Sequence, residues 1–195
     1  MKIITIPHST LRTEAQEVKT VDKKLIKFVK ELEDTLFKKN NPRGVGLAAP
    51  QVDTKWRIFT TQLPTEPQSD EYKLRSFINP RVADHSDTHT FGPDKKEPIL
   101  EGCLSIPAFY GPVPRWEWID LTYDYIDGNE LKTATEHFAD FAARVAQHEL
   151  DHLDGILFID YTIQYDLPLY KEDPKTEKME ELEPELILAL AEKAK

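Results

Sequence analysis

Two histidines four residues apart are the strongest chemical signal in the chain. They open and close the pentapeptide His148-Glu149-Leu150-Asp151-His152. In an α-helix, residues i and i+4 differ by about 40° around the axis and about 6 Å along it, so both imidazoles can share a tetrahedral metal ion. Glu149 would then lie close enough to act on a water at the metal. The pattern predicts a metal-dependent hydrolase; two unrelated polar residues on a helix face are the simpler alternative.

A third metal ligand has to come from elsewhere in the chain, because a catalytic metal usually takes three protein ligands and keeps one position for water. No histidine follows His152, and Gly155 is expected to end the helix. Cys103, the one cysteine, is the outstanding candidate, since a thiolate is a strong ligand for iron or zinc. A buried thiol that serves only as a small hydrophobic side chain explains the same residue, so both interpretations stay open.

Composition limits the kind of protein. The chain has 195 residues and a net charge of −10, which indicates one acidic domain with room for a tail. Its overall charge argues against binding to nucleic acid or to an anionic membrane. A lone cysteine excludes an internal disulfide, and the sequence shows neither a signal peptide nor a membrane-spanning run. We therefore expect a cytoplasmic location.

The amino-terminal half is predicted to hold one helix and two strands. Apolar residues recur at helical spacing from Leu25 to Leu36, with Asp22 as the cap and Asn40-Asn41-Pro42 as the end. Strands are expected at residues 56–61 and 74–78. Residues 62–73 are predicted to be a polar loop, and Asn79-Pro80 is predicted to end the second strand.

A polar stretch follows at residues 84–98, which we expect to be an exposed loop. It contains His85, His89 and Asp94, and solvent exposure explains these residues better than a second metal site does.

The carboxy-terminal half is predicted to contain a hairpin and the metal-binding helix. Strands at residues 116–126 and 129–137 flank the turn signal Asp127-Gly128, and the helix is expected to begin near Phe138. A capping box at Thr133-x-x-Glu136, which would start the helix earlier, is the alternative. An apolar piece at 156–161, an acidic Pro-containing stretch at 166–184 and a short helix at 185–193 complete the chain.

Three segments together resemble the signature motifs of the peptide deformylase family. They occur in the family's order, and the resemblance extends from the first residues to about Tyr161. The segments are Gly44-Val45-Gly46-Leu47-Ala48-Ala49-Pro50-Gln51, Glu101-Gly102-Cys103-Leu104-Ser105, and Gln147-His148-Glu149-Leu150-Asp151-His152-Leu153-x-Gly155.

The resemblance implies an α+β fold, in which small mixed or antiparallel β-sheets pack around the central HExxH helix. The amphipathic helix would precede this arrangement and the short helix would close it. Residues 1–165 would form the catalytic domain, and residues 166–195 would form an acidic tail that ends in the short helix.

The resemblance also implies an activity, the hydrolytic removal of the formyl group from amino-terminal formylmethionine, with release of formate. Cys103, His148 and His152 would hold one divalent metal ion, with Fe²⁺ expected and Zn²⁺, Ni²⁺ or Co²⁺ left open. Water on the metal would be the nucleophile, and Glu149 would be the general base and acid.

Substrate contacts follow from the same resemblance. The Gln51 side chain and the Leu104 backbone N–H would donate to the oxyanion, and the Gly46 backbone would pair with the extended substrate. The methionine side chain would enter an apolar pocket. Arg144, one turn before His148, is a candidate for the rim of that pocket, although a surface or ion-pairing role is favoured.

The implied partners are formylmethionyl nascent peptides, and contact with the ribosome stays open because the acidic tail would be repelled by phosphate. An endopeptidase shares the pentapeptide but lacks the other two motifs. A closed structural metal site would need a fourth protein ligand, and no second cysteine is present to supply one.

Overall fold

The computed structural model describes residues 1–40, 43–65, 71–94 and 97–194. The helices are α1 (Lys23–Phe37), α2 (Asp140–Leu153), α3 (Phe158–Gln164) and α4 (Pro184–Lys193), with the 3₁₀ turns η1 (Ser9–Arg12) and η2 (Ala49–Val52). The strands are β1 (Gly46–Ala48), β2 (Ile58–Pro64), β3 (Tyr72–His85), β4 (His89–Thr90), β5 (Leu100–Cys103), β6 (Ile106–Pro112), β7 (Arg115–Trp116), β8 (Trp118–Asp127), β9 (Glu130–Ala139), β10 (Tyr170–Glu172) and β11 (Met179–Glu181).

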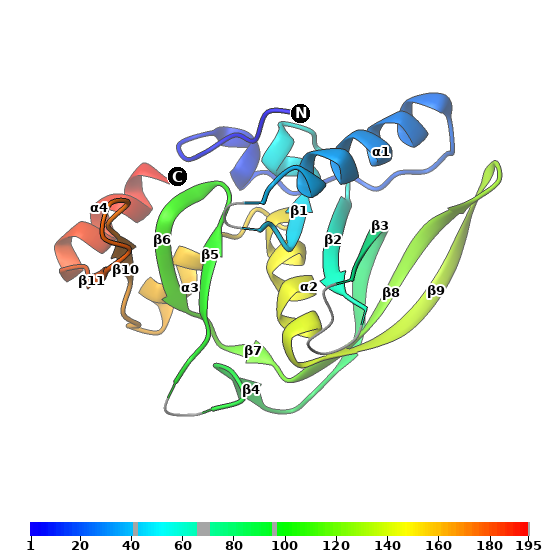
Figure 1. Cartoon of the computed structure of the whole chain (residues 1–195). Helices are drawn as coiled ribbons and strands as arrows, with labels where there is room; N and C mark the ends of the chain where they lie inside the picture. Colours follow the sequence, from blue (N-terminus) through cyan, green and yellow to red (C-terminus); the bar gives the residue numbers. More distant parts are fainter. Residues whose placement is uncertain (41–42, 66–70, 95–96, 195) are drawn as a thin grey trace.

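Antiparallel sheets surround one central helix. The larger sheet has the order β1-β2-β3-β8-β9, a second has the order β11-β10-β6-β5, and β4 pairs with β7. Figure 1 shows α2 between the five-stranded sheet and the β5–β6 hairpin. The predicted α+β fold is confirmed. No helix in the described ranges has the length and apolar character needed to cross a membrane.

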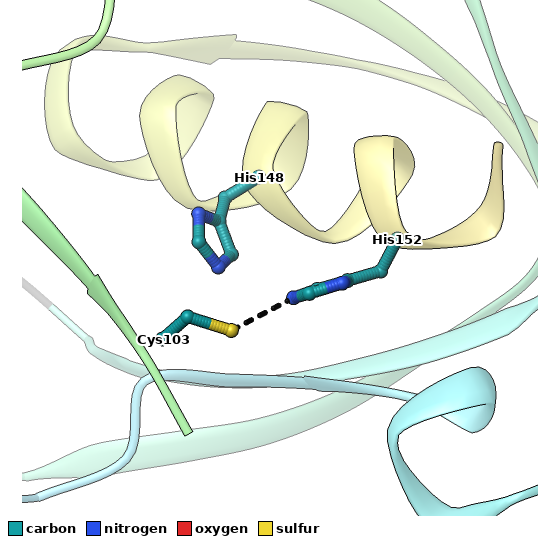
Figure 2. Close-up of side chains that lie close together, drawn as sticks. All are labelled: Cys103, His148 and His152. Carbon is teal, nitrogen blue, oxygen red and sulfur yellow. Dashed lines mark hydrogen bonds between the residues drawn. The ribbon is translucent and has the colours of Figure 1, made fainter. Parts of the chain in front are cut away.

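Apolar packing fixes the position of α2. Ala143, Ala146, Leu150 and Leu153 are buried in one cluster with Phe59 and Phe77 of the sheet. Burial of a large apolar side chain contributes roughly 1.5–3 kcal/mol, so this face holds the helix against the sheet. The histidines occupy another face of the same helix and are directed toward β5 (Figure 2).

The two predicted helix starts differ in how closely they match the structure. At α1, Asp22 Oδ1 accepts a hydrogen bond from the Leu25 N–H at 2.7 Å, as expected of a cap. Strand β9 continues to Ala139, and α2 begins at Asp140, whose φ of 52° turns the chain from strand to helix. The capping-box alternative is wrong, because Thr133 and Glu136 lie within β9. Asn41 and Pro42, expected to end α1, lie outside the described residues.

The second predicted strand is longer than expected. β3 does not end at Asn79-Pro80 but continues to His85, and the pairing with β8 shifts register between Ile78 and Arg81. Asn79 adopts a φ of 48°, and its amide exchanges two hydrogen bonds of 2.8 Å with the Val18 backbone. A bulge of this kind lets a strand accommodate a proline without ending.

Two predicted loops are shorter than expected. The 62–73 loop loses residues 62–64 to β2 and 72–73 to β3, and its central residues 66–70 lie outside the described part. In the 84–98 stretch, the short strand β4 pairs with β7, and His85 and His89 both stack against Trp116. His85 and His89 are exposed, as predicted; residues 95 and 96 lie outside the description.

The end of the chain is more ordered than its composition indicated. The apolar piece at 156–161 leads into α3, and the acidic stretch contains β10 and β11. The final helix, α4, was predicted almost to the residue. Leu169 and Ala194 are buried in the same cluster as Cys103, so this segment packs on the β5–β6 side of the molecule (Figure 1).

Gly155 is expected to be intolerant of substitution. Its φ is +74°, and an added Cβ would lie 2.9 Å from the Arg12 carbonyl carbon and oxygen. Gly155→Ala should lower the free energy of unfolding by more than the roughly 1–2 kcal/mol that the left-handed conformation costs, as measured by urea unfolding. Gly128→Ala is the control, since Gly128 has a φ of +63° with nothing within 4 Å of the added Cβ. Equal losses in the two variants would contradict the packing argument.

Candidate metal centre

Three side chains from two distant segments meet beside α2. Cys103 ends β5, while His148 and His152 lie one turn apart on the helix (Figure 2). One ligand atom from each lies within 4.8 Å of the others, and Cys103 Sγ is 3.2 Å from His152 Nε2. The three residues that the sequence proposed as ligands are therefore brought together.

The chemistry of these donors fits a divalent metal ion. His148 Nδ1 lies 2.9 Å from Glu101 Oε2, which leaves its Nε2 for a metal. Burial lowers the pKa of His152 well below its usual range, so that its imidazole is in the neutral form that binds metals. The described residues supply no hydrogen-bond partner for His152 Nδ1. Thiolate and imidazole suit iron, zinc, cobalt and nickel.

Glu149 lies next to this trio with little solvent around it. Its side chain is buried, Oε2 has no hydrogen-bond partner among the described residues, and burial raises its pKa to about 7. Gly46 packs directly on this carboxylate, because a Cβ there would overlap the Glu149 side chain. Gly46 thus leaves the space in which Glu149 lies beside β1.

Gln51 is oriented by the backbone of its own turn. The Ala48 N–H donates to Gln51 Oε1 at 2.8 Å, which directs Nε2 toward Ser105 Oγ at 3.3 Å and Cys103 Sγ at 3.5 Å. A buried amide fixed in this way presents an N–H donor to the centre. Leu104 follows Cys103 directly and lines the same cavity.

A buried network of charges surrounds His148. Glu101 accepts hydrogen bonds from Arg115 Nε at 3.0 Å and from Arg144 Nη1 at 2.8 Å, in addition to its contact with His148. Burial alone would raise the pKa of Glu101, but the Arg115 charge and these hydrogen bonds hold it well below its usual range. Arg115 also donates to Asp151 at 2.5 Å. The ionised Glu101 fixes the ring of His148 and, together with Asp151, balances the charges of Arg115 and Arg144.

Removal of the Glu101 carboxylate is expected to destabilise the fold strongly. Glu101→Ala leaves Arg115 and Arg144, both buried, without their shared partner, and breaking a buried pair costs about 3–5 kcal/mol. Urea unfolding measures the loss. Glu136→Ala is the control, because its pair with Arg75 is partly exposed and should contribute about 1 kcal/mol or less. If Glu101→Ala lost no more than the control, the buried network would not stabilise the fold.

The favoured prediction for Arg144 is confirmed in part. The expected ion pair is present, because Arg144 pairs with Glu101, whereas the alternative of a surface position is wrong, because the side chain is buried. It also donates to the carbonyls of Val113 and Thr90. Arg144 does line the cavity described next.

A cavity of about 500 Å³ opens onto Cys103 and His148 of the trio. Its inner part is bounded by Cys103, His148, Glu149 and Gln51, and apolar side chains of Ile99, Val145 and Phe141 also line it. The volume is of the size that binds small molecules or short peptide segments. All the residues that the sequence assigned to substrate binding, Gly46, Gln51 and Leu104, line this cavity.

Sequence reasoning missed the roles of Glu101 and Arg115. One signal was available: Glu101 precedes Cys103 by two residues in a strand, and residues i and i+2 share a face. A carboxylate on the ligand's face is a candidate partner for a metal-binding histidine. Arg115, the second partner of Glu101, lies on another strand, β7, and the sequence carries no signal for the pairing of these two residues.

The fold and the site define a class: an α+β protein whose central helix carries an HExxH pentapeptide, with a cysteine completing a group able to hold a metal. The model of the polypeptide deformylase family matches residues 1–166, and the chain belongs to this family.

Relatives agree with the family match. The chain is 37% identical over 159 residues to a peptide deformylase of Pseudothermotoga lettingae, covering 82% of this chain and 81% of that protein. It is 36% identical over 161 residues to a peptide deformylase of Chromohalobacter salexigens, covering 83% of this chain and 85% of that protein. A crystal structure of peptide deformylase from Plasmodium falciparum superposes with a TM-score of 0.69 at 33% identity, covering 85% of this chain and 88% of that chain.

Proposed function

We propose that this protein hydrolyses the formyl group from formylmethionine at the amino terminus of nascent polypeptides and releases formate. The observation that carries the proposal is the Cys103–His148–His152 group, of which Cys103 and His148 line a cavity together with the buried Glu149. Membership of the polypeptide deformylase family supports it.

The three ligands would hold one divalent ion, for which we propose Fe²⁺. When bound, such an ion acts as a Lewis acid and lowers the pKa of a water ligand to about 7. Glu101 contributes by fixing the His148 ring through Nδ1, so that Nε2 faces Cys103 and His152. Metal analysis of protein purified without exposure to air tests the identity of the ion.

Glu149 would move the proton during hydrolysis of the amide. Its carboxylate takes a proton from the attacking water and delivers it to the nitrogen as the C–N bond breaks, which yields formate and a free amino terminus. The Gln51 Nε2 and the Leu104 N–H would donate hydrogen bonds to the oxyanion of the tetrahedral intermediate. The fixed amide of Gln51 suits this role, because no reorientation is needed.

Selectivity would arise from the shape of the cavity. A formyl carbon carries only hydrogen, so close packing around Cys103, Gln51 and Glu149 would exclude acetyl and longer acyl groups by volume. The backbone at Gly46 would pair with the extended substrate, in the mode in which a peptide adds a strand to a sheet edge. The first side chain, methionine, would lie among Ile99, Phe141 and Val145.

Formate release from a formylmethionyl peptide by the metal-loaded protein tests the proposal. We expect turnover of the formylated peptide and little turnover of its acetylated analogue. Cleavage of internal bonds in an unformylated casein-like substrate, without formate release, would favour an endopeptidase. A bound metal with neither activity would favour a structural site.

A further inference from the structure

The segment beyond the family match reaches the substrate cavity. Glu172 lies at the end of β10, six residues after the last matched position, and it lines the cavity. β10 pairs with β6, with Tyr170 opposite Tyr110 and Lys171 opposite Phe109. The sheet that carries Cys103 is thereby extended, and its new strand brings a carboxylate to the cavity.

Glu172 is held in place by a cavity residue of the catalytic part. The Tyr110 hydroxyl donates to Glu172 Oε2 at 3.1 Å. The ring of Tyr110 packs on Gly102, since a Cβ added there would lie 2.6 Å from Tyr110 Cε1. Tyr110 therefore connects Glu172 to the residue that precedes Cys103.

The rest of this segment is anchored independently of the cavity. Leu169 is fully buried, and the Leu182 N–H donates to the Leu169 carbonyl at 2.8 Å. Arg12 Nε donates to the Ala194 carbonyl at 2.7 Å. These contacts hold the segment on both sides of Glu172.

Within the described part of the chain, the carboxylate of Glu172 has no cationic partner. No lysine or arginine of the described residues forms an ion pair with it, and its one hydrogen bond there is to the neutral Tyr110. Two cations, Lys39 and Arg43, line the cavity from the segment between α1 and β1, on the other side of the β5–β6 hairpin from β10 (Figure 1). The cavity lining thus receives an acidic group from β10 and two basic groups from the segment before β1.

We infer that Glu172, supplied by the carboxy-terminal segment, selects substrates with a basic side chain in the residues that follow the formylated methionine. The inference rests on the proposed function. The formyl group must lie at Cys103, and the methionine side chain must lie among the apolar residues. Glu172 belongs to neither of these parts of the cavity, so it is available only to the residues that follow the methionine. Successive side chains of an extended peptide alternate in direction, so one of them faces the Glu172 side of the cavity.

The test compares kcat/KM of the metal-loaded protein for formylated peptides with lysine or glutamate at the second or third position. The readout is the ratio of kcat/KM for the lysine peptide to kcat/KM for the glutamate peptide, and how this ratio changes when Glu172 is substituted. The change is used because Lys39 and Arg43 also contribute to the ratio itself. Glu172→Gln, which can still accept from Tyr110, should lower the ratio by on the order of threefold, the range of a partly exposed charge pair. Glu172→Lys should lower it further, and added salt should reduce the wild-type ratio.

Glu180→Gln is the matched control. Glu180 lies opposite Lys171 on β11 of the same hairpin, is exposed and does not line the cavity, so its removal should leave the ratio unchanged. An unchanged ratio in Glu172→Gln, or an equal change in Glu180→Gln, would overturn the inference while formate release continued. No formate from any formylated peptide with the wild-type protein would overturn the proposed function as well.

Discussion

Glu149→Gln is expected to reduce formate release by a factor on the order of 10²–10⁴, the contribution typical of a general acid–base group. Glutamine keeps the size of the side chain but cannot take a proton from water. The carboxylate is buried, and the described residues give Oε2 no hydrogen-bond partner. It is therefore available to a reacting group rather than committed to the fold. Steady-state kinetics with a formylmethionyl peptide measure the loss.

Metal content separates a proton-transfer role from a ligand role in this variant. Glu149 is not a member of the trio, so Glu149→Gln should keep one metal ion per chain. Loss of metal together with activity would mean that Glu149 is a ligand, and unchanged turnover would exclude it from proton transfer. Thermal unfolding should show no large loss of stability, since the substitution removes no paired charge.

Local patterns predicted those parts of the fold that depend on neighbouring residues. The period of apolar residues from Leu25 to Leu36 and the cap at Asp22 are short-range signals, and α1 matches them. The hairpin at Asp127-Gly128 is another, because Gly128 adopts the positive φ that its turn requires. The His148–His152 spacing belongs to the same class, since helix geometry alone directs both rings to one face.

Features set by distant contacts were not predictable in this way. Asn79-Pro80 is a normal strand end by local rules; β3 continues there because Asn79 bonds to the Val18 backbone, 61 residues away. For Arg144 the sequence leaves a surface role and an ion-pairing role open, since nothing nearby in sequence shows that its side chain would pair with Glu101, 43 residues away. β10 is three residues long, and its pairing with β11 and with the distant strand β6 makes it a strand.

Assigning the third metal ligand needs both the local sequence pattern and the distant contacts. Histidine spacing predicted a metal, yet a lone cysteine was equally explained as a small buried side chain. The structure satisfies both descriptions, because Cys103 is buried among apolar residues and its sulfur lies 3.2 Å from His152 Nε2. Burial and proximity to histidine therefore do not distinguish a ligand from a packed thiol, whereas the affinity for metal does.

Cys103→Ala is expected to weaken metal binding by more than about 100-fold. Loss of a partner that only orients a ligand already costs about 10–100-fold in metal affinity, and Cys103 would contribute a donor atom itself. Two imidazoles alone leave a divalent ion with half of a tetrahedral shell. The metal-to-protein ratio after dialysis, followed by chelator competition, measures the change, and formate release should fall with it.

Ser105→Ala provides the matched comparison for this variant. Ser105 is buried in the same hairpin and accepts a hydrogen bond from Gln51, but its oxygen is not part of the trio. It should therefore keep its metal. If Cys103→Ala kept a full complement of metal as well, the thiol would be only a small packed side chain. The two histidines would then need a third ligand from elsewhere, and since the described residues offer no other such group, the proposed hydrolytic centre would be wrong.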